Sequence, residues 1–483
     1  MRYVVFAFLL VSLASFLFLD QSSSKDKLPA IRISDSGRYL VKETGESFFW
    51  LGDTAWKLFA GLDKQGAKRY LKDRKQKKFT VIQAHLLDWE FNYANAYGEA
   101  PFSGDDLTSP NEAYWQHADY IINQAEKLGL YMALLPIWAR SHIEPMKGKV
   151  EGKVLYDDTL AAYNYGKFLG NRYRNKSHII WILGGDTWGT RDTIYQKLAQ
   201  GLADGAAGGD QSKLLMSFHP QGGTFRPPAT STGEFYHDQK WLDFNMIQSG
   251  HNLGNKNYER IQEDYHRQPV KPTLDSEPCY EGHPVKHKYE NGMFTAWHLR
   301  RRAYWSLLAG ACGFTYGANG IWQMDRPGSI RKESHYKDYW YDALDYEGAQ
   351  DMTYVRELME SRPFISPERI PDQGILVSEA GAVDDRVQCA RAADSSYWIL
   401  YITDGREITV NLSQVSGQRC HAWWYNPRDG KRYEENQHRT NKPFATFDTG
   451  GEQVFDPPGE RGQENDWVLV LDDAAKGYSI PGM

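Results

Sequence analysis

An acidic residue, Asp186, follows closely after a strongly apolar segment of this chain. The segment from Ile179 to Leu183 is rich in β-branched and aromatic residues, which predicts a strand buried on both faces, and two glycines then open it into a loop. In a parallel α/β sheet or barrel, catalytic groups gather where strands end, so a carboxylate here is held rigidly and can reach a substrate. An apolar wall such as Trp188 would raise the pKa of this acid by disfavouring its ionised form. The alternative is that Asp186 caps the helix that begins near Arg191.

A second carboxylate, Glu277, lies in the predicted loop after a later strand. Two carboxylates on opposite sides of one barrel mouth suit glycoside hydrolysis, because one protonates the leaving oxygen and the other attacks the anomeric carbon or activates water. We therefore predict Asp186 as the acid and Glu277 as its catalytic partner. Glu277 has the alternatives of a structural turn residue and of an ion-pair partner for Arg300 or Arg301. Glu281, in the same loop, is the substitute candidate.

Further polar and aromatic residues follow the other predicted strands and form a ring around the same mouth. The polar members are Asp53, Asp88, Glu90, Asn92, Arg140, His219, His251 and Tyr316. The aromatic members are Trp56, Trp89, Trp138, Trp188 and Trp322. Aromatic planes suit sugar rings, whose C–H faces stack on them, so we predict that this ring binds a carbohydrate.

Several members of this ring have a second interpretation. Asp53 either hydrogen-bonds a substrate hydroxyl or braces the mouth. His219 and His251 orient the nucleophile, bind sugar hydroxyls or are satisfied structural groups. Asp88 and Glu90 follow the second strand and are interpreted as binding groups rather than proton donors.

The sequence predicts neither a metal nor a cofactor. No His, Asp or Glu cluster shows metal-ligand spacing, and no GxGxxG or GxxxxGK[ST] motif follows the first predicted strand. The four cysteines lack CxxC spacing and do not form a zinc motif. They are Cys279, Cys312, Cys389 and Cys420. A disulfide between Cys389 and Cys420 is chemically allowed in an exported protein.

Strands and helices alternate along most of the chain, and these elements must position the residues above. The predicted strands cover residues 48–51, 79–87, 130–138, 179–183, 214–218, 244–248, 271–275 and 313–317. The predicted helices cover residues 63–77, 111–128, 159–175, 193–206, 257–267, 295–308 and 352–361. This alternation fits a (β/α)8 barrel better than an open doubly wound sheet. The run Arg300-Arg301-Arg302 is most simply a solvated face of its helix.

The composition changes after Arg362. Short alternating runs such as 397–402 and 467–471 are then separated by Gly, Asp and Asn turns, which predicts an all-β module of the sandwich type. A length of 483 residues also favours two domains. The predicted division is an N-terminal segment 1–28, a barrel 29–362 and a β module 363–483.

The overall composition narrows the class of partner. Aromatic residues make up 14% of the chain, and the net charge is −6 without a basic stripe, which argues against nucleic acid. One arginine and an apolar run from Tyr3 to Leu19 predict an export signal, so we expect a periplasmic, cell-surface or extracellular protein. No small-x-small cleavage site is evident, so an uncleaved anchor is the alternative, and a membrane is an expected partner only in that case.

Four motifs in this order resemble the apiosidase-like glycoside hydrolases, family 140. They are LGDTAW, DWEFNYANAYGEAPF, WILGGDTW and LDSEPCYEG. The resemblance implies a (β/α)8 barrel followed by a β module of the collagen-binding type. It also implies a secreted or surface bacterial enzyme that cleaves bonds made by apiose in pectin, notably in rhamnogalacturonan II. The catalytic pair of the family maps onto Asp186 as acid/base and Glu277 as nucleophile.

We therefore expect a glycoside hydrolase, of the retaining kind, that acts on a plant cell-wall polysaccharide or its fragments. The β module is expected to brace the barrel rather than to bind collagen. The rival hypothesis is a non-catalytic carbohydrate-binding or surface-adhesion protein built on an inactive barrel, since sites rather than folds carry function.

Overall fold

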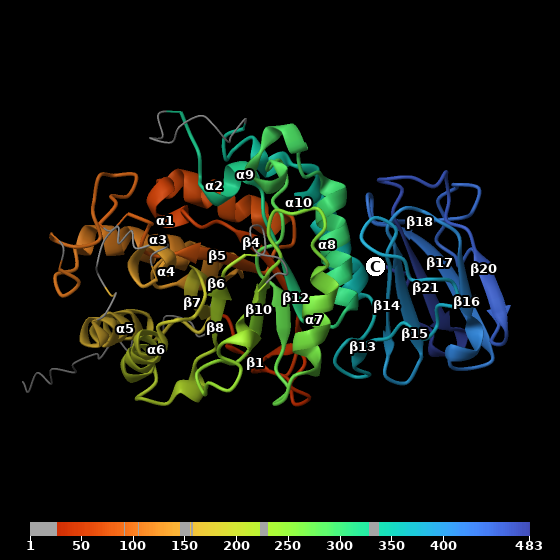
Figure 1. The fold of residues 1–483 in the computed structure, drawn as a ribbon, viewed down its shortest axis with the longest axis horizontal. Coiled ribbons are helices and arrows are strands. Elements are labelled where there is room, and N and C mark those ends of the chain that lie inside the picture. Colours follow the sequence, from red (N-terminus) through yellow and green to blue (C-terminus); the bar gives the residue numbers. More distant parts are fainter. Residues whose placement is uncertain are drawn as a thin grey trace, which may run out of the picture.

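The computed structural model describes residues 27–90, 92–104, 106–144, 155, 158–222, 230–327 and 338–483. Within these residues, a parallel barrel is followed by an antiparallel β domain at one side of it (Figure 1). This architecture confirms the predicted (β/α)8 barrel with a C-terminal β-sandwich. The predicted export segment, except its last two residues, lies outside the described residues. No described helix combines the length and the apolar composition that crossing a bilayer requires.

Eight parallel strands build the barrel. They are β4 (Trp50–Thr54), β5 (Val81–His85), β6 (Tyr131–Leu135), β7 (Ile179–Thr187), β8 (Met216–Pro220), β10 (Asn245–Gln248), β11 (Thr273–Asp275) and β12 (Gly313–Tyr316). Their order around the sheet is β8-β7-β6-β5-β4-β12-β11-β10, and the short β9 (Thr230–Ser231) pairs with β10. Thr232 spans the remaining gap, because its hydroxyl oxygen lies 2.6 Å from Phe218 O of β8 and 3.1 Å from Met246 O of β10.

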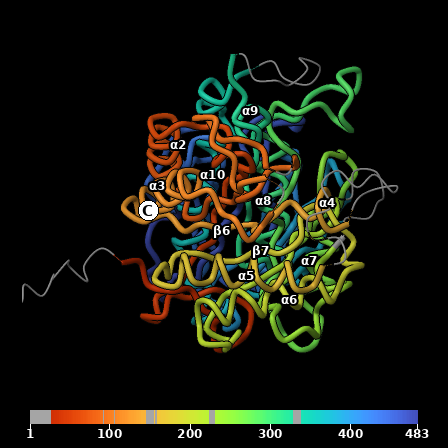
Figure 2. Tube along the Cα trace, turned by 90° about the vertical axis from the view of Figure 1, so that its left-hand side faces the viewer, coloured from red at the N-terminus to blue at the C-terminus, as the bar shows by residue number. Residues whose placement is uncertain are grey.

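Helices surround these strands. They are α1 (Leu58–Gly61), α2 (Lys64–Gln76), α3 (Glu112–Lys127), α4 (Ala139–His142), α5 (Thr159–Tyr173), α6 (Asp192–Ala206), α7 (Asn257–His266), α8 (Ala296–Leu308), α9 (Asn319–Trp322) and α10 (Glu347–Glu360). Both views place α5 beside α6 on one side of the barrel, with α2 and α9 on the opposite side (Figure 1, Figure 2).

Local sequence explains where these helices begin and end. In α3, the Asn111 side chain accepts a hydrogen bond from the backbone of Ala113 and so caps the first turn. The apolar positions of α3, including Ala118 and Ile122, are buried at helical spacing. Gly129 follows the helix with φ of 73°, a left-handed conformation that glycine adopts without steric strain.

Nine strands build the C-terminal domain. They are β13 (Arg369–Pro371), β14 (Val387–Ala392), β15 (Tyr397–Ile402), β16 (Ile408–Asn411), β17 (Arg419–Asn426), β18 (Lys431–Tyr433), β19 (Ala445–Asp448), β20 (Glu452–Phe455) and β21 (Trp467–Asp473). β16 and β20 form a separate two-stranded sheet, and the other seven form one antiparallel sheet. Before the barrel, β1 (Ile31–Ile33), β2 (Leu40–Lys42) and β3 (Ser47–Phe48) form a small antiparallel sheet.

The large C-terminal sheet is buried on both faces. In β15, Tyr397, Ile399 and Tyr401 belong to the core shared with the barrel. The alternate residues Trp398 and Leu400 belong to the core inside the sandwich. Because successive side chains of a strand point to opposite faces, alternate residues of this apolar run enter two different cores. The core that contains Tyr397, Ile399 and Tyr401 joins the two domains.

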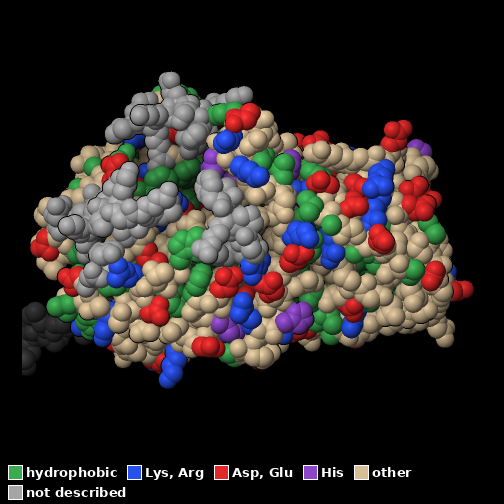
Figure 3. Space-filling model, in the orientation of Figure 1, with side chains coloured by type: hydrophobic (Ala, Val, Ile, Leu, Met, Phe, Trp, Pro, Cys, Tyr) green, Lys and Arg blue, Asp and Glu red, His purple; other side chains and the backbone are tan. Residues whose placement is uncertain are grey.

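Figure 3 shows acidic and basic side chains interspersed over both domains on the face in view.

Helix α8 lies between the barrel and the C-terminal domain, and all its residues are buried (Figure 1). The interpretation of Arg300-Arg301-Arg302 as a solvated face is wrong, because the C-terminal domain covers this helix. Arg300 forms ion pairs with Asp351 of α10 at 2.7 Å and with Asp466 of the C-terminal domain at 2.9 Å. Arg300 and Arg301, which pairs with Asp384, thus belong to the interdomain interface, whereas Arg302 bonds the barrel loop at Asn252.

All four cysteines are buried free thiols, so the allowed Cys389–Cys420 disulfide is not formed. Cys389 lies in β14 and Cys420 in β17, and β15 and β21 separate these two strands in the sheet. The predicted boundary at residue 362 falls in the connection between α10 and β13.

Candidate active site

A cavity of 330 Å³ opens at the carboxyl ends of the barrel strands, within the size range of small-molecule sites. The residues that line it are Trp56, Trp89, Trp138, Arg140, Asp186, Gln221, Gly222, Gln248, His251, Glu277, Tyr280, His283, His287 and Trp322. Both predicted catalytic carboxylates are among them. They come from opposite parts of the sheet, β7 and the loop after β11.

An irregular end of β7 presents Asp186 to the cavity. The register against β8 shifts between Gly184 and Thr187, and Asp186 has φ of 53°. A left-handed conformation costs a non-glycine residue about 1–3 kcal/mol and is concentrated at functional sites. The α6 helix begins at Asp192 with Arg191 at its N-cap, so Asp186 is not its capping residue.

Arg140 is the partner of the Asp186 carboxylate. Its Nη1 donates to Asp186 Oδ2 at 3.0 Å, and both side chains are partly exposed. Among the described residues, Asp186 Oδ1 is buried without a hydrogen bond. The side-chain amide of Gln221, oriented to satisfy both of its polar atoms, donates to Asp186 O at 2.6 Å. Arg140 thus anchors one carboxylate oxygen, and the other makes no hydrogen bond within the described residues.

Glu277 is held more tightly and is only 5% exposed. His219 Nε2, at the end of β8, lies 2.9 Å from Glu277 Oε2. The Tyr280 hydroxyl donates to Glu277 Oε1, and Trp56 Nε1 donates to the same hydroxyl at 3.0 Å. A Cβ on Gly317 would lie 2.0 Å from the Tyr280 ring, so this ring position requires glycine at 317.

The electrostatics of Glu277 combine opposing effects. Burial raises the pKa of Glu277 above its usual value, and the hydrogen bond and charge of His219 and the hydrogen bond from Tyr280 offset only part of this rise. The charge of Asp186 raises the pKa of Glu277 again, as expected for two neighbouring carboxylates. The two donors therefore stabilise the ionised form against burial.

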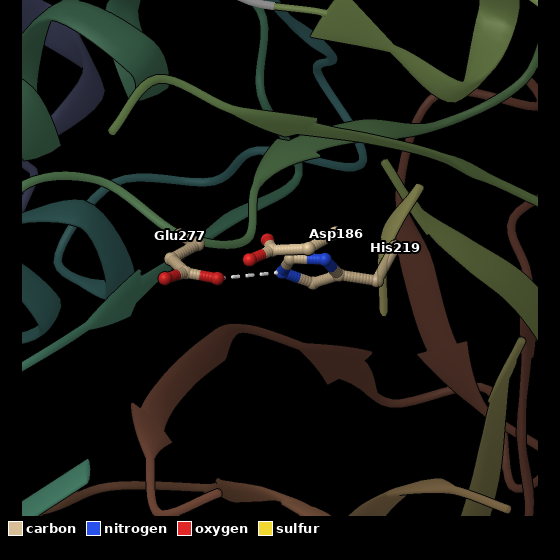
Figure 4. Close-up of side chains that lie close together, drawn as sticks. All are labelled: Asp186, His219 and Glu277. Atoms are coloured by element: carbon tan, nitrogen blue, oxygen red, sulfur yellow. Dashed lines mark ion pairs between the residues drawn. The ribbon is translucent and has the colours of Figure 1, made fainter. Parts of the chain in front are cut away.

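Asp186, His219 and Glu277 converge in space (Figure 4). One oxygen or nitrogen atom from each lies within 4.8 Å of the others, so these described residues form a group able to hold a metal ion. The 2.9 Å between His219 and Glu277 is a hydrogen-bond distance, shorter than the ~3.3 Å between two ligands of one tetrahedral zinc. Sequence spacing did not reveal this group, because its members come from three different strands.

Tryptophans form one wall of the cavity. Trp56 and Trp138 rings lie 5.1 Å apart between centroids, and Trp89 lies 5.9 Å from Trp138 and 5.5 Å from Trp322. Lys57 stands over the Trp89 ring at 4.7 Å and pairs with Asp88 at 2.7 Å. The wall offers aromatic faces of the kind on which sugar rings stack.

Histidines form another part of the lining, which the sequence only partly indicated. His251 stacks on His283 with 4.1 Å between ring centroids, and His287 meets both edge-on. The His251 ring also lies 4.7 Å from the ring of Tyr280. Only His251 was predicted, because His283 and His287 lie beyond the strand end in the loop after Glu277.

Two predicted binding residues point away from the cavity. Asp53 is fully buried against α2, where it accepts a hydrogen bond from Tyr70 and lies 3.5 Å from Arg74. Tyr316 is also fully buried and donates to Glu281 at 2.6 Å. Neither residue lies in the cavity lining, and the contacts of Asp53 with α2 agree with the interpretation that it braces the mouth. Glu281 is occupied by Tyr316 and lies outside the cavity lining, so it does not replace Glu277.

Besides His219, which contacts Glu277 from β8, four other predicted residues lie near the mouth but outside the lining of the cavity. Asp88 is buried and pairs with Lys57. Asn92 bonds the backbone of Phe102 and Gly104 and so shapes its own loop. The remaining two are Glu90, which is exposed, and Trp188, which is half-buried.

Six lining residues were missed by sequence reasoning: Gln221, Gly222, Gln248, Tyr280, His283 and His287. Two signals could have found some of them. Gln221 and Gln248 lie at or just after strand ends, as do the residues that were selected. Tyr280 lies three residues after Glu277, in the same loop.

A parallel barrel with paired carboxylates and tryptophans at the carboxyl ends of its strands defines the class of barrel glycoside hydrolases. Residues 34–366 match the family model described as apiosidase-like, catalytic domain, and the chain belongs to this family. Residues 370–472 match the family described as the putative collagen-binding domain of a collagenase.

Solved structures agree with this class. A glycoside hydrolase is 33% identical over 93% of this chain and 98% of its own, with a TM-score of 0.82. A glycoside hydrolase family 5 structure from Bacteroides vulgatus ATCC 8482 is 32% identical over 93% of this chain and 94% of its own, also with a TM-score of 0.82. No curated protein shows significant sequence similarity to the chain.

Proposed function

We propose that this protein is an exported, retaining glycoside hydrolase of family 140 that cleaves apiosidic bonds in pectic polysaccharide such as rhamnogalacturonan II. The observation that carries the proposal is the pair Asp186 and Glu277 in one cavity, with carboxylate oxygens within 4.8 Å of each other. Carboxyl groups about 5–5.5 Å apart are typical of retention, whereas about 6.5–9.5 Å leaves room for the water of an inverting reaction.

Glu277 is the nucleophile in this proposal. Two donors, His219 and Tyr280, stabilise its carboxylate, which favours the ionised form needed for attack. A Glu277 oxygen bonds to the anomeric carbon as the bond from that carbon to the leaving oxygen breaks. The product of this step is a glycosyl ester on Glu277.

Asp186 is the acid and then the base. Arg140 occupies Oδ2, so Oδ1 is the oxygen that carries the transferable proton. In the first step this proton passes to the leaving oxygen. In the second step Asp186 takes a proton from water, whose oxygen attacks the anomeric carbon and frees Glu277.

The substrate assignment is supported by the family match and by the aromatic lining. The chain belongs to the apiosidase-like family, and its cavity offers tryptophan faces to a sugar ring. The apolar run from Tyr3 to Leu19 supports export, which would bring the enzyme to a polysaccharide outside the cell.

The test is a screen of the purified protein on rhamnogalacturonan II and simpler pectic oligosaccharides, with binding measured in parallel. Release of apiose-containing products is the expected result, and proton NMR of the first product should show retained anomeric configuration. Binding without products would favour the rival carbohydrate-binding protein. Products from other glycans alone would keep the hydrolase and overturn the apiosidic assignment.

A further inference from the structure

The loop of residues 249–256, which follows β10, contacts the segment that carries Glu277. Gly250 N donates to Glu277 O at 3.0 Å, and Ser249 Oγ donates to Asp275 Oδ2 at 2.7 Å. The same loop carries His251 into the cavity lining. Movement of this loop would therefore move both the backbone of Glu277 and one wall of the cavity.

Two buried arginines of α8 bind the outer turn of this loop. Arg302 Nη2 donates to Asn252 O at 2.6 Å and lies 3.3 Å from Leu253 O. Arg301 Nη2 donates to Leu253 O at 3.4 Å. A guanidinium group is a rigid multiple donor, so two of them on adjacent carbonyls restrain a turn that has no regular secondary structure.

Arg301 also reaches the C-terminal domain. Its Nη1 donates to Asp384 Oδ1 at 2.8 Å. Its guanidinium lies between two rings of its own helix, 4.5 Å from Trp297 and 4.9 Å from Trp305. Both rings donate to Thr403 of the C-terminal domain, at 3.1 Å to its carbonyl and 3.3 Å to its hydroxyl. One side chain thus contacts the C-terminal domain and the active-site loop.

We propose that Arg301 is a positioning residue through which the C-terminal domain fixes loop 249–256, and with it Glu277 and His251, while Arg302 holds the same turn from within the barrel. The C-terminal domain would then contribute to catalysis by keeping Glu277 and His251 in place. The kinetic consequence rests on the proposed function, whereas the restraint on the loop does not.

The variants that test this are Arg301→Met and Arg301→Lys in the full-length chain. Methionine keeps the apolar length between the two rings but donates nothing. Lysine can reach only one of the two acceptors, so it should restore part of the restraint. The matched control is Arg362→Met. Arg362 is equally buried and pairs with Asp472 of the C-terminal domain at 2.6 Å, but it does not contact loop 249–256.

Hydrogen exchange read by mass spectrometry tests the restraint without any substrate. In Arg301→Met, the amides of residues 249–256 should exchange about tenfold faster than in the wild type, and Arg301→Lys should lie between them. Arg362→Met should leave the exchange of this loop unchanged. Unchanged exchange in Arg301→Met, or an equal increase in the control, would overturn the proposal.

Kinetics on the best substrate of the pectic screen test the consequence for catalysis. Arg301→Met should lower kcat by about tenfold, because a displaced nucleophile loses alignment, and Arg362→Met should keep the wild-type kcat. Faster exchange of the loop amides with an unchanged kcat would overturn the claim that the loop positions Glu277 for catalysis. If no substrate were hydrolysed by the wild type, the proposed function would fail while the exchange result still decided the loop restraint.

Discussion

The barrel mouth and the interdomain interface both place arginine against aspartate, but they treat these charges differently. At the interface, all three nitrogens of the Arg300 guanidinium are bonded, two to Asp466 and one to Asp351. At the mouth, Arg140 bonds one oxygen of Asp186 and the backbone of Asp186 is left-handed. The interface pairs are thus withdrawn from water, whereas the Arg140 and Asp186 side chains at the mouth are 32% and 18% exposed and open to solvent and substrate.

This difference follows from desolvation. A buried ion pair is costly to break, because removal of one partner leaves the other charge desolvated and uncompensated. Groups that must react cannot be fully bonded beforehand, and strain at such a site is compensated by the rest of the fold. Changes at the mouth should therefore alter rate, and changes at the interface should alter stability.

The largest effect on rate is expected from the two carboxylates. Asp186→Asn should lower kcat by about 10²–10⁴-fold, the usual contribution of a general acid, and Glu277→Gln should lower kcat at least as much. Asparagine tolerates left-handed backbone, so Asp186→Asn should fold normally. Turnover and the thermal unfolding midpoint are measured together. Near-wild-type turnover in either folded variant would contradict the assignment.

Arg300→Met should have the largest effect on stability. It leaves Asp351 buried without a cation and Asp466 with only Arg428 at 3.2 Å, which costs about 3–5 kcal/mol of unfolding free energy. Burial already raises the pKa of Asp351 to about 7, against the lowering effect of Arg300. Without Arg300 the pKa of Asp351 rises further, so the loss should be larger at pH 8 than at pH 5, where this carboxyl is protonated in the folded state.

Urea unfolding at the two pH values measures this effect. The control is Glu360→Gln, which breaks the exposed pair with Arg356 and should change the unfolding free energy by less than about 0.5 kcal/mol. Equal losses in the two variants would show that the interface pair is no more important than a surface pair.

Tyr280→Phe should have a smaller effect on rate and a specific effect on its pH dependence. The Tyr280 hydroxyl lowers the pKa of Glu277, so its removal raises that pKa. The acidic limb of the kcat/KM profile should move to higher pH, and the optimum rate should fall by about tenfold, as for a lost hydrogen bond to a charged group.

Tyr316→Phe is the matched control for Tyr280→Phe. It also removes a buried tyrosine hydroxyl from a glutamate, but that glutamate is Glu281, outside the cavity lining. Its profile should coincide with the wild type. A shift of similar size in both variants would mean that the fold, rather than Glu277, is being perturbed.

The smallest effect on activity is expected from Asp53→Asn. Burial raises the pKa of Asp53 to about 6, so the folded state binds a proton that the unfolded state releases at lower pH. This group therefore reduces wild-type stability as pH rises from about 4 to about 6, and the variant should lack that contribution. The free energy of unfolding at several pH values measures this contribution. An increase in the KM of the variant would show instead that Asp53 takes part in substrate binding.

Strand ends predicted much of the mouth, since Asp186, Glu277 and Arg140 all lie where the pattern placed them. The same reasoning failed for Asp53 and Tyr316, which are register partners on β4 and β12. Successive strand residues point to opposite faces, so a shift of one residue decides between the cavity and the helix layer. A sequence shows that a strand ends but not which face its last residues present.

The sequence by itself determined the barrel, the β module and the carboxylates, because apolar periodicity and glycine breaks are local signals. Only the tertiary structure decided which groups hold Glu277 and what covers α8. His219 meets Glu277 across strands, and Arg300 and Arg301 pair with Asp466 and Asp384 of a domain that follows later in the chain. Those outcomes depend on contacts between distant segments, and local patterns do not encode them.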